Sequence, residues 1–137
     1  MKKINATKQE FVDLINGLLQ VQELKGKKFS LLVSKNLNIL QKNLEDVQKA
    51  GTPSEEFLEL AQKVNMIASG KAPDSQEQID KLEAENKELV DARKEQMAKV
   101  TEMLKEEIEV ELNMLPEDTL PEDVTAKQIN SIINIIE

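Results

Sequence analysis

Acidic side chains are the residues of this chain that could do chemistry, and they gather near residue 110. Glu106, Glu107, Glu109 and Glu111 follow one another closely, and paired carboxylates can act as a general acid and a general base. The sequence contains neither His nor Cys, which excludes the usual zinc sites, Ser-His and Cys-His nucleophiles and imidazole catalysis. It also has no nucleophile elbow, phosphate loop or dinucleotide fingerprint. We therefore predict a protein that is not an enzyme and needs no cofactor.

A second acidic cluster comes from the tetrapeptide LPED, which occurs twice, at residues 115–118 and 120–123. Clustered carboxylates suggest a calcium site. The spacing differs from that of an EF-hand loop, however, and the cluster contains no glycine. We expect a rigid acidic connection without a metal ion, in which proline ends the preceding element.

Four lysines form a basic cluster at the start of a predicted helix: Lys25, Lys27, Lys28 and Lys35. A helix N-terminus favours negative charge, so one interpretation is an anion or phosphate site. The segment lacks the glycine-rich loop and the interleaved aromatic residues that would support this interpretation. Solvated lysines, or partners for the acidic part of the chain, are the favoured interpretation, and we predict no binding to nucleic acid.

Charge is divided unevenly along the chain. The net charge is −8, yet the residues up to Lys49 contain nine Lys and five acidic residues, and the remainder contains nine Lys or Arg and twenty-one acidic residues. Such asymmetry disfavours a protein that binds phosphate backbones. It would help the two halves to dock or let copies stack head to tail. A solvated acidic face without a function is the simpler alternative.

Helical periodicity dominates the elements that must position these residues. The apolar residues are almost all aliphatic, with only three Phe and no Trp or Tyr, which suits packed helices. Apolar stripes predict helices that begin near Thr7, Phe29, Pro53, Ser75 and Thr125. Four of these starts carry a capping-box pattern, namely Thr7 with Glu10, Thr52 with Glu55, Ser75 with Gln78 and Thr125 with Gln128.

The longest pattern covers residues 75–106, which contain no Pro or Gly and predict one long helix. Its apolar seam includes Leu89 and Val100 and is interrupted by Asn86 and Arg93. The interruption either sets the register of a coiled coil or marks a solvated, partner-facing stretch between two packed ends. The second interpretation is favoured. We predict interactions with a partner at these four positions.

A short strand follows the long helix. Glu107, Glu109, Glu111 and Asn113 alternate with aliphatic residues, the pattern of a half-buried strand. A lone strand would leave its backbone groups unmatched, so we expect it to pair with an extended segment within residues 20–28. The acidic strand edge should then join copies or neighbouring proteins.

These patterns predict a mainly α protein, a helical bundle with one long helix at about residues 75–106 and a small two-stranded β element. A chain of 137 residues is the size of one domain, here with a linker at residues 71–75 and part of residues 76–106 projecting. No apolar run is long enough to cross a bilayer, and no signal peptide is visible. We expect no contact with a membrane.

The order of these parts resembles a family of small tailed-bacteriophage proteins of unassigned function. The matching parts are the opening helix at Thr7–Leu19, the dipeptide Leu24-Lys25 before a basic helix with stripe Val33, Leu37, Leu40 and Leu44, the run EEIEVEL at Glu106–Leu112, the proline-containing acidic connection and the closing TAKQI helix at Thr125–Ile129. The resemblance covers about two-thirds of the chain. It implies an origin in a phage and brings no catalytic residues.

We therefore expect a non-enzymatic bacteriophage protein that acts through protein–protein contacts, as a structural or assembly component that oligomerises or joins virion proteins. Its partners would be further copies of itself or a virion protein. The alternative is a host-directed binder or inhibitor of a host nucleic-acid or defence enzyme that uses its acidic surface. Either protein would work in the cytoplasm of an infected bacterial host, or in the virion assembled there.

Overall fold

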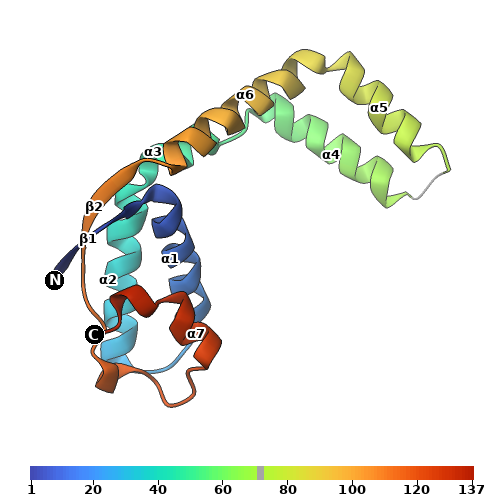
Figure 1. Ribbon diagram of the computed structural model, residues 1–137. Helices are drawn as coiled ribbons and strands as arrows, with labels where there is room; N and C mark the ends of the chain where they lie inside the picture. The colour runs from blue at the N-terminus through green and yellow to red at the C-terminus, as the bar shows by residue number, and fades with distance from the viewer. Residues whose placement is uncertain (71–72) are drawn as a thin grey trace. The chain divides into compact units, whose positions relative to one another are not determined.

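The computed structural model describes residues 1–70 and 73–137 and is mainly helical, as predicted (Figure 1). Its elements, in chain order, are β1 (Lys2–Thr7), α1 (Lys8–Val21), α2 (Lys27–Asn43), α3 (Glu45–Gly51), α4 (Glu55–Ser69), α5 (Ser75–Glu85), α6 (Lys87–Leu104), β2 (Glu107–Leu112), the 3-10 turn η1 (Glu117–Thr119), α7 (Ala126–Ser131) and the 3-10 turn η2 (Ile133–Ile135). Residues 71 and 72 of the predicted linker lie outside the described residues. No helix among the described residues is long and apolar enough to cross a membrane.

The chain divides into two compact units. The core unit contains residues 1–47 and 102–137, and the hairpin unit contains residues 48–101. Both boundaries lie away from the linker that the sequence suggested at residues 71–75. The predicted single domain stays a prediction.

The core unit buries one continuous apolar cluster. Helices α1 and α2 supply stripes at helical spacing, β2 and the residue after it supply aliphatic side chains, and the C-terminal segment closes the cluster. Its buried members are Phe11, Leu14, Leu18, Val21, Phe29, Val33, Leu37, Leu40, Leu44, Val110, Leu112, Leu115, Ile132 and Ile135. The last two residues show that the C-terminal segment docks on the core. Ile133 is 52% exposed because α7 ends at Ser131 and a 3-10 turn changes the period.

The small sheet is confirmed, but its predicted pairing is wrong. Strand β2 pairs antiparallel with β1, in a register that sets Ile4 opposite Val110 and Ala6 opposite Ile108. The segment expected to pair, residues 20–28, instead ends α1, turns at Gly26 and begins α2. The φ of Gly26 is 148°, a value that favours glycine. The signal for β1 was weak because only Ile4 and Ala6 mark its apolar face.

Two helices that the sequence predicted as continuous are each interrupted once. The helix predicted to begin near Phe29 breaks at Leu44, and the long helix breaks at Asn86, where Figure 1 shows its axis turning. At each break an asparagine side-chain amide donates to the carbonyl four residues earlier, from Asn43 to Ile39 at 2.8 Å and from Asn86 to Leu82 at 2.9 Å. Such local bonds compete with a regular helix. The described residues therefore hold seven helices in place of five.

The helix caps also differ in part from the predictions. Thr125 and Gln128 form the predicted capping box, and the Thr7 hydroxyl accepts from the Glu10 N–H. Thr52 does not cap α4, since its hydroxyl donates to the Gln48 carbonyl at 2.9 Å and so closes the end of α3. Ser54 takes its place as the cap.

The hairpin unit is built by α4 packing against α5, with α6 continuing from α5. Of its described residues, only Leu60 and Val100 are buried apolar side chains. The rest of the stripe on α4, including Phe57, Val64 and Ile67, is half-buried. This unit therefore encloses much less apolar surface than the core unit.

Candidate interaction surfaces

The three predicted acidic strand residues share one exposed face of the sheet. Glu107, Glu109 and Glu111 are all exposed, and they alternate with Ile108, Val110 and Leu112, which face the core cluster. Across the ladder they lie opposite Thr7, Asn5 and Lys3 respectively. The pair Lys3–Glu111 sets opposite charges against each other, which favours this register.

Asn113 does not belong to this face, because it lies beyond the last residue of β2. Its backbone N–H donates to the Asn36 Oδ1 at 2.8 Å, and its carbonyl accepts from the Asn36 Nδ2 at 2.8 Å. Asn36, on α2, is fully buried. Its amide thus bonds the backbone of Asn113 as a neighbouring strand would. The sequence analysis missed Asn36, whose one signal is a polar residue within the apolar stripe between Val33 and Leu37.

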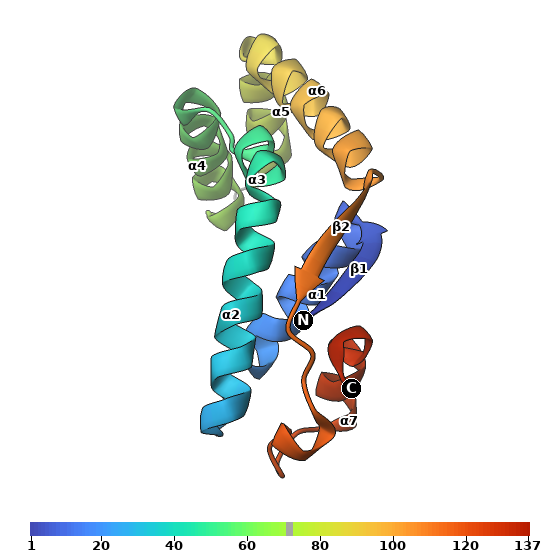
Figure 2. The ribbon, with the colours of Figure 1, turned by 90° about the vertical axis from the view of Figure 1, so that its left-hand side faces the viewer.

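Asn113 is therefore not free to extend the acidic edge of β2, and an interaction through Glu107, Glu109 and Glu111 stays a prediction. One side of β2 is paired with β1, and β2 also contacts α2, to which Asn36 ties the next residue (Figure 2). Strand β1 likewise pairs on one side, and its other main contacts are with its own helix α1. No residue of β1 is buried.

Lys8 joins three segments of the core unit. Although only 7% of its side chain is exposed, its ammonium group is 2.8 Å from Asp46 Oδ2 and 2.8 Å from Glu106 Oε2. Its backbone N–H also donates to the Glu106 carbonyl at 2.9 Å. Asp46 and Glu106 come just before and just after the hairpin unit in the sequence. Lys8 therefore binds the two segments through which the chain leaves and re-enters the core unit. No local pattern in the sequence predicted this contact.

The ion pairs shift the pKa values of Lys8 and Asp46 in opposite directions. The hydrogen bonds from the Lys8 ammonium to Asp46 and Glu106 raise the pKa of Lys8 above its ordinary value, although burial opposes this. The Lys8 hydrogen bond lowers the pKa of Asp46, again against the effect of burial. Both charges are thus favoured at neutral pH.

Arg93, predicted to face a partner, is engaged inside the hairpin unit. Its Nη1 donates to the Gly51 carbonyl at 2.8 Å, and its guanidinium lies 5.6 Å from the centre of the Phe57 ring. Gln96, one turn further along α6, donates to the Ala50 carbonyl at 2.7 Å and to the Thr52 carbonyl at 2.6 Å. The carbonyls at the end of α3 would otherwise lack partners, and a cation near a helix C-terminus is favourable.

The other predicted positions on the long helix also contribute to the chain's own structure. Val100 is buried and lies 3.7 Å from where a side chain on Gly51 would begin. Leu89 is half-buried and lines a small pocket with Phe57 and Arg93. Asn86 stands at the helix break. An interaction with a partner at these four positions stays a prediction, but none of them is a freely exposed side chain.

The basic cluster is exposed at the start of α2. Lys25, Lys27, Lys28 and Lys35 are all exposed, and neither a side-chain cap nor an acidic residue occupies the first turn of α2. A side chain on Gly26 would begin 3.9 Å from Pro121, which belongs to the second LPED repeat. The second LPED repeat thus passes beside Gly26, and the role of these lysines stays a prediction.

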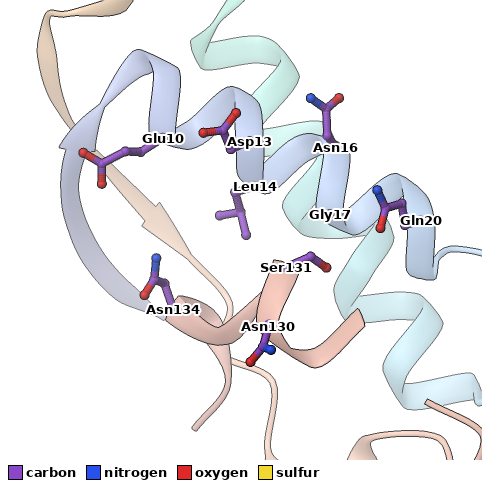
Figure 3. A pocket seen from close by; sticks show the side chains of 9 residues that line it. All are labelled: Glu10, Asp13, Leu14, Asn16, Gly17, Gln20, Asn130, Ser131 and Asn134. Atoms are coloured by element: carbon purple, nitrogen blue, oxygen red, sulfur yellow. The ribbon is translucent and has the colours of Figure 1, made fainter. Parts of the chain in front are cut away.

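A polar groove of about 400 Å³ lies between α1 and the C-terminal segment (Figure 3). Gly17 makes this contact possible, since a Cβ atom at this position would be 2.5 Å from the Ser131 carbonyl oxygen. The groove is lined by Glu10, Asp13, Leu14, Asn16, Gly17, Gln20, Asn130, Ser131 and Asn134.

The groove offers hydrogen bonds but no reactive group. The Asp13 carboxylate already accepts from Gln9 at 2.9 Å, and the Ser131 hydroxyl donates to the Gln128 carbonyl at 2.6 Å. Among the described residues no cluster of three or more acidic side chains could hold a metal ion. The lining therefore suits recognition by amide side chains and contains no activated nucleophile.

Large apolar side chains are exposed in both units of the described chain. In the hairpin unit Leu58 is 48% exposed, Met66 76% and Met97 41%, and the core unit has Met1, Leu19, Leu31 and Ile133. Single exposed apolar residues are normal. What distinguishes the hairpin unit is that these residues accompany very few buried apolar side chains, which leaves apolar surface available for contacts.

Comparisons with models of known protein families, with curated proteins and with solved structures found no match for this chain.

Proposed function

We propose that this chain is a non-enzymatic bacteriophage protein that acts through protein–protein contacts, as a structural or assembly component that oligomerises or joins virion proteins. The phage origin rests on the resemblance in the order of the sequence motifs. The action through contacts rests on one observation, the poorly covered apolar face of the hairpin unit.

The physical argument starts from the small core of this unit. A pair of amphipathic helices cannot enclose its own apolar stripes, so bundles use three or four helices. Here only Leu60 and Val100 are buried apolar residues among those described, and Leu58 and Met66 remain accessible on α4. Covering such side chains releases water and favours association. Methionine also adapts to irregular partner surfaces, which suits Met66 and Met97.

The test is the mass in solution by light scattering, at low and high salt. A discrete oligomer that survives high salt is expected, since apolar contacts are not screened. The double variant Leu58→Asp with Met66→Asp should shift the mass towards the monomer.

The matched control adds the same charge to exposed polar positions of α5, as Gln76→Glu with Gln78→Glu, because Gln62 and Ser69 of α4 lie on the same helix face as Leu58 and Met66. It should leave the mass unchanged. An oligomer that is equally stable in both double variants would remove the hairpin unit as the contact surface. Val100→Asp is unsuitable for this purpose, because Val100 is buried within the chain and its loss would damage the fold.

The exposed acidic face of the sheet favours the second candidate, a host-directed binder or inhibitor of a host nucleic-acid or defence enzyme. Three carboxylates on one face would compete for a basic cleft and give salt-sensitive binding. Changing Glu107, Glu109 and Glu111 to Lys should abolish capture of a host protein from lysate. The control changes Glu117, Asp118 and Glu122, three acidic residues of the LPED repeats, to Lys. Equal capture by both triple variants would exclude this candidate.

A further inference from the structure

The edge of β1 that faces away from β2 has no backbone partner among the described residues. Strand β1 pairs with β2 on its other side, and the bond that extends this ladder runs from the Lys8 N–H to the Glu106 carbonyl at 2.9 Å. Backbone groups alternate in direction along an antiparallel strand. Since those of Lys8 face β2, those of Ala6, Ile4 and Lys2 do as well.

The outward-facing groups are then those of Lys3, Asn5 and Thr7. Thr7 is the N-cap of α1, and the carbonyl of an N-cap accepts the first bond of its helix. Lys3 and Asn5 therefore leave two N–H groups and two carbonyls free on this edge. A strand edge of this kind accepts another strand.

We propose that β1 pairs with β1 of a second copy, antiparallel across a two-fold axis at Ile4. In this register Lys3 lies opposite the partner's Asn5, and Asn5 lies opposite the partner's Lys3. Each pair exchanges two backbone hydrogen bonds, so the N–H groups and carbonyls of Lys3 and Asn5 on each edge are satisfied by the same groups of the other. The interface is self-complementary, as a two-fold contact must be.

Side chains support this register on both faces of the resulting four-stranded sheet. On the apolar face the half-buried Ile4 meets the Ile4 of the partner, next to Val110 on each side. On the outer face each Lys3 lies between Glu111 of its own chain and an amide, so the inner strands are basic and the flanking strands acidic. A second copy suits this edge because each Lys3 keeps its own acidic neighbour and no lysine lies directly opposite another.

The neighbouring registers are less favourable. A shift by two residues towards Met1 would set Lys3 opposite the partner's Lys3, and like charges directly opposite are destabilising. A shift the other way would depend on Thr7, whose carbonyl is used by α1. Lysines on an edge can also discourage pairing, but the register centred on Ile4 keeps them apart.

The first experiment is a cross-linking test, which is specific because the chain has no cysteine of its own. Non-hydrogen-bonded antiparallel pairs have Cα atoms about 4.5 Å apart, within the range that a disulfide spans. Ile4→Cys should therefore give a covalent dimer under mild oxidation. Ala6→Cys is the matched control on the same face, because its two copies would be about 13 Å apart. Equal cross-linking of both variants, or none with Ile4→Cys, would overturn the proposal.

The second experiment measures the dimer without a cross-link. Asn5→Pro removes an outward N–H while leaving the ladder to β2 intact, and should raise the dimer dissociation constant about tenfold or more. Asn5→Ser changes the side chain but keeps the N–H, and should leave the constant within about twofold. An unchanged constant in Asn5→Pro would also overturn the pairing.

This inference names a partner within the proposed function and rests on it, but the two can fail separately. An oligomer that loses mass in the Leu58 and Met66 double variant, yet shows no cross-link at residue 4, would keep the proposed function and reject the β1 contact. A monomer at all concentrations would reject self-association at both surfaces.

Discussion

The core unit and the hairpin unit contain similar kinds of helices but use them differently. In the core unit, α1, α2, the sheet and the C-terminal segment surround one apolar cluster, and buried polar groups such as Asn36 and Lys8 have partners. Among the described residues of the hairpin unit, two buried apolar residues are accompanied by exposed Leu58 and Met66. The first unit has the enclosure needed for a stable fold, and the second leaves apolar surface accessible for contacts.

The difference follows from the number of layers. A stripe on one helix is enclosed only when other elements cover it from several sides. The core unit provides two long helices, a sheet and a docked C-terminal segment, whereas the hairpin unit provides α4 on one side and α5 with α6 on the other. Polar contacts by Arg93 and Gln96 at the end of α3 hold the hairpin unit without a large core.

The largest expected effect compares a leucine from each unit. Leu40→Ala should reduce the free energy of unfolding by about 3 to 5 kcal/mol, because this side chain is fully buried and its loss leaves a cavity. Leu58→Ala should reduce it by less than about 1 kcal/mol, since the side chain is half exposed. Denaturant unfolding of both variants measures the difference. Similar losses would mean that the hairpin unit is covered in solution.

The next largest loss of stability is expected from removing the side-chain amide of Asn36. Asn36→Ala leaves the N–H and carbonyl of Asn113 without their partner and should cost about 2 kcal/mol. Asn43→Ala is the control on the same helix, since Asn43 is exposed and bonds only to the carbonyl of Ile39. We expect little or no loss there, because alanine favours a helix. If urea midpoints of the two variants agreed, Asn36 would not be fastening β2 to α2.

Substitution of Gly17 should show that the C-terminal segment docks on α1 only when residue 17 has no side chain. In Gly17→Ala the new Cβ atom meets the Ser131 carbonyl oxygen at 2.5 Å, so we expect a net loss of about 1 to 2 kcal/mol despite the gain in helix propensity. In Gly51→Ala of the hairpin unit the atom nearest to the new Cβ is Val100 Cγ2 at 3.7 Å, an ordinary contact. We therefore expect no loss in the free energy of unfolding. Faster amide exchange in residues 126–135 of Gly17→Ala alone would locate the effect.

A comparable effect is expected at Lys8, and it depends on pH. Lys8→Met should cost about 1 to 2 kcal/mol at neutral pH through the lost charged hydrogen bonds. The pKa of Asp46 is lowered from 3.8, so its contribution is present above 3.8 and is lost as pH falls through the folded value. The pKa of Lys8 is raised from 10.5, so its contribution is present below 10.5 and is lost as pH rises through the folded value.

The stability gap between the wild-type chain and Lys8→Met should therefore be widest between these limits and narrow beyond either one. Thermal unfolding across the pH range measures it. Lys105→Met is the control, because the pair of Lys105 with Glu102 is exposed and its removal should have no measurable effect. A gap that stayed constant with pH would show that Lys8 contributes packing alone.

Sequence reasoning succeeded where the signal was local. The period of the apolar residues predicted the helices, strict alternation predicted the strand at Glu107–Leu112, and Thr125 with Gln128 predicted the start of α7. It failed where a short local bond competed with the period, as at Asn43 and Asn86, or where one hydroxyl could serve either of two helices, as at Thr52.

The predicted contact residues likewise divide into those explained by a local pattern and those explained by distant segments. Exposure of Glu107, Glu109 and Glu111 followed from alternation alone. Three other features did not follow from a local pattern, because each depends on a segment far away in the sequence. They are the hydrogen bond from Arg93 to Gly51, the burial of Val100 and the hydrogen bond from Asn36 to Asn113.

By itself, then, the sequence determined the mainly helical class, the acidic face of one strand and the absence of cysteine and histidine chemistry, since these follow from composition and from periods of a few residues. Only the tertiary structure decided which strand pairs with β2, why α1 needs a glycine at residue 17, and that Lys8 joins Asp46 to Glu106, 98 residues away from Lys8. The physical reason is that many chain segments could satisfy a strand edge, a helix groove or a buried charge, and the choice among them is made by packing the whole unit at once.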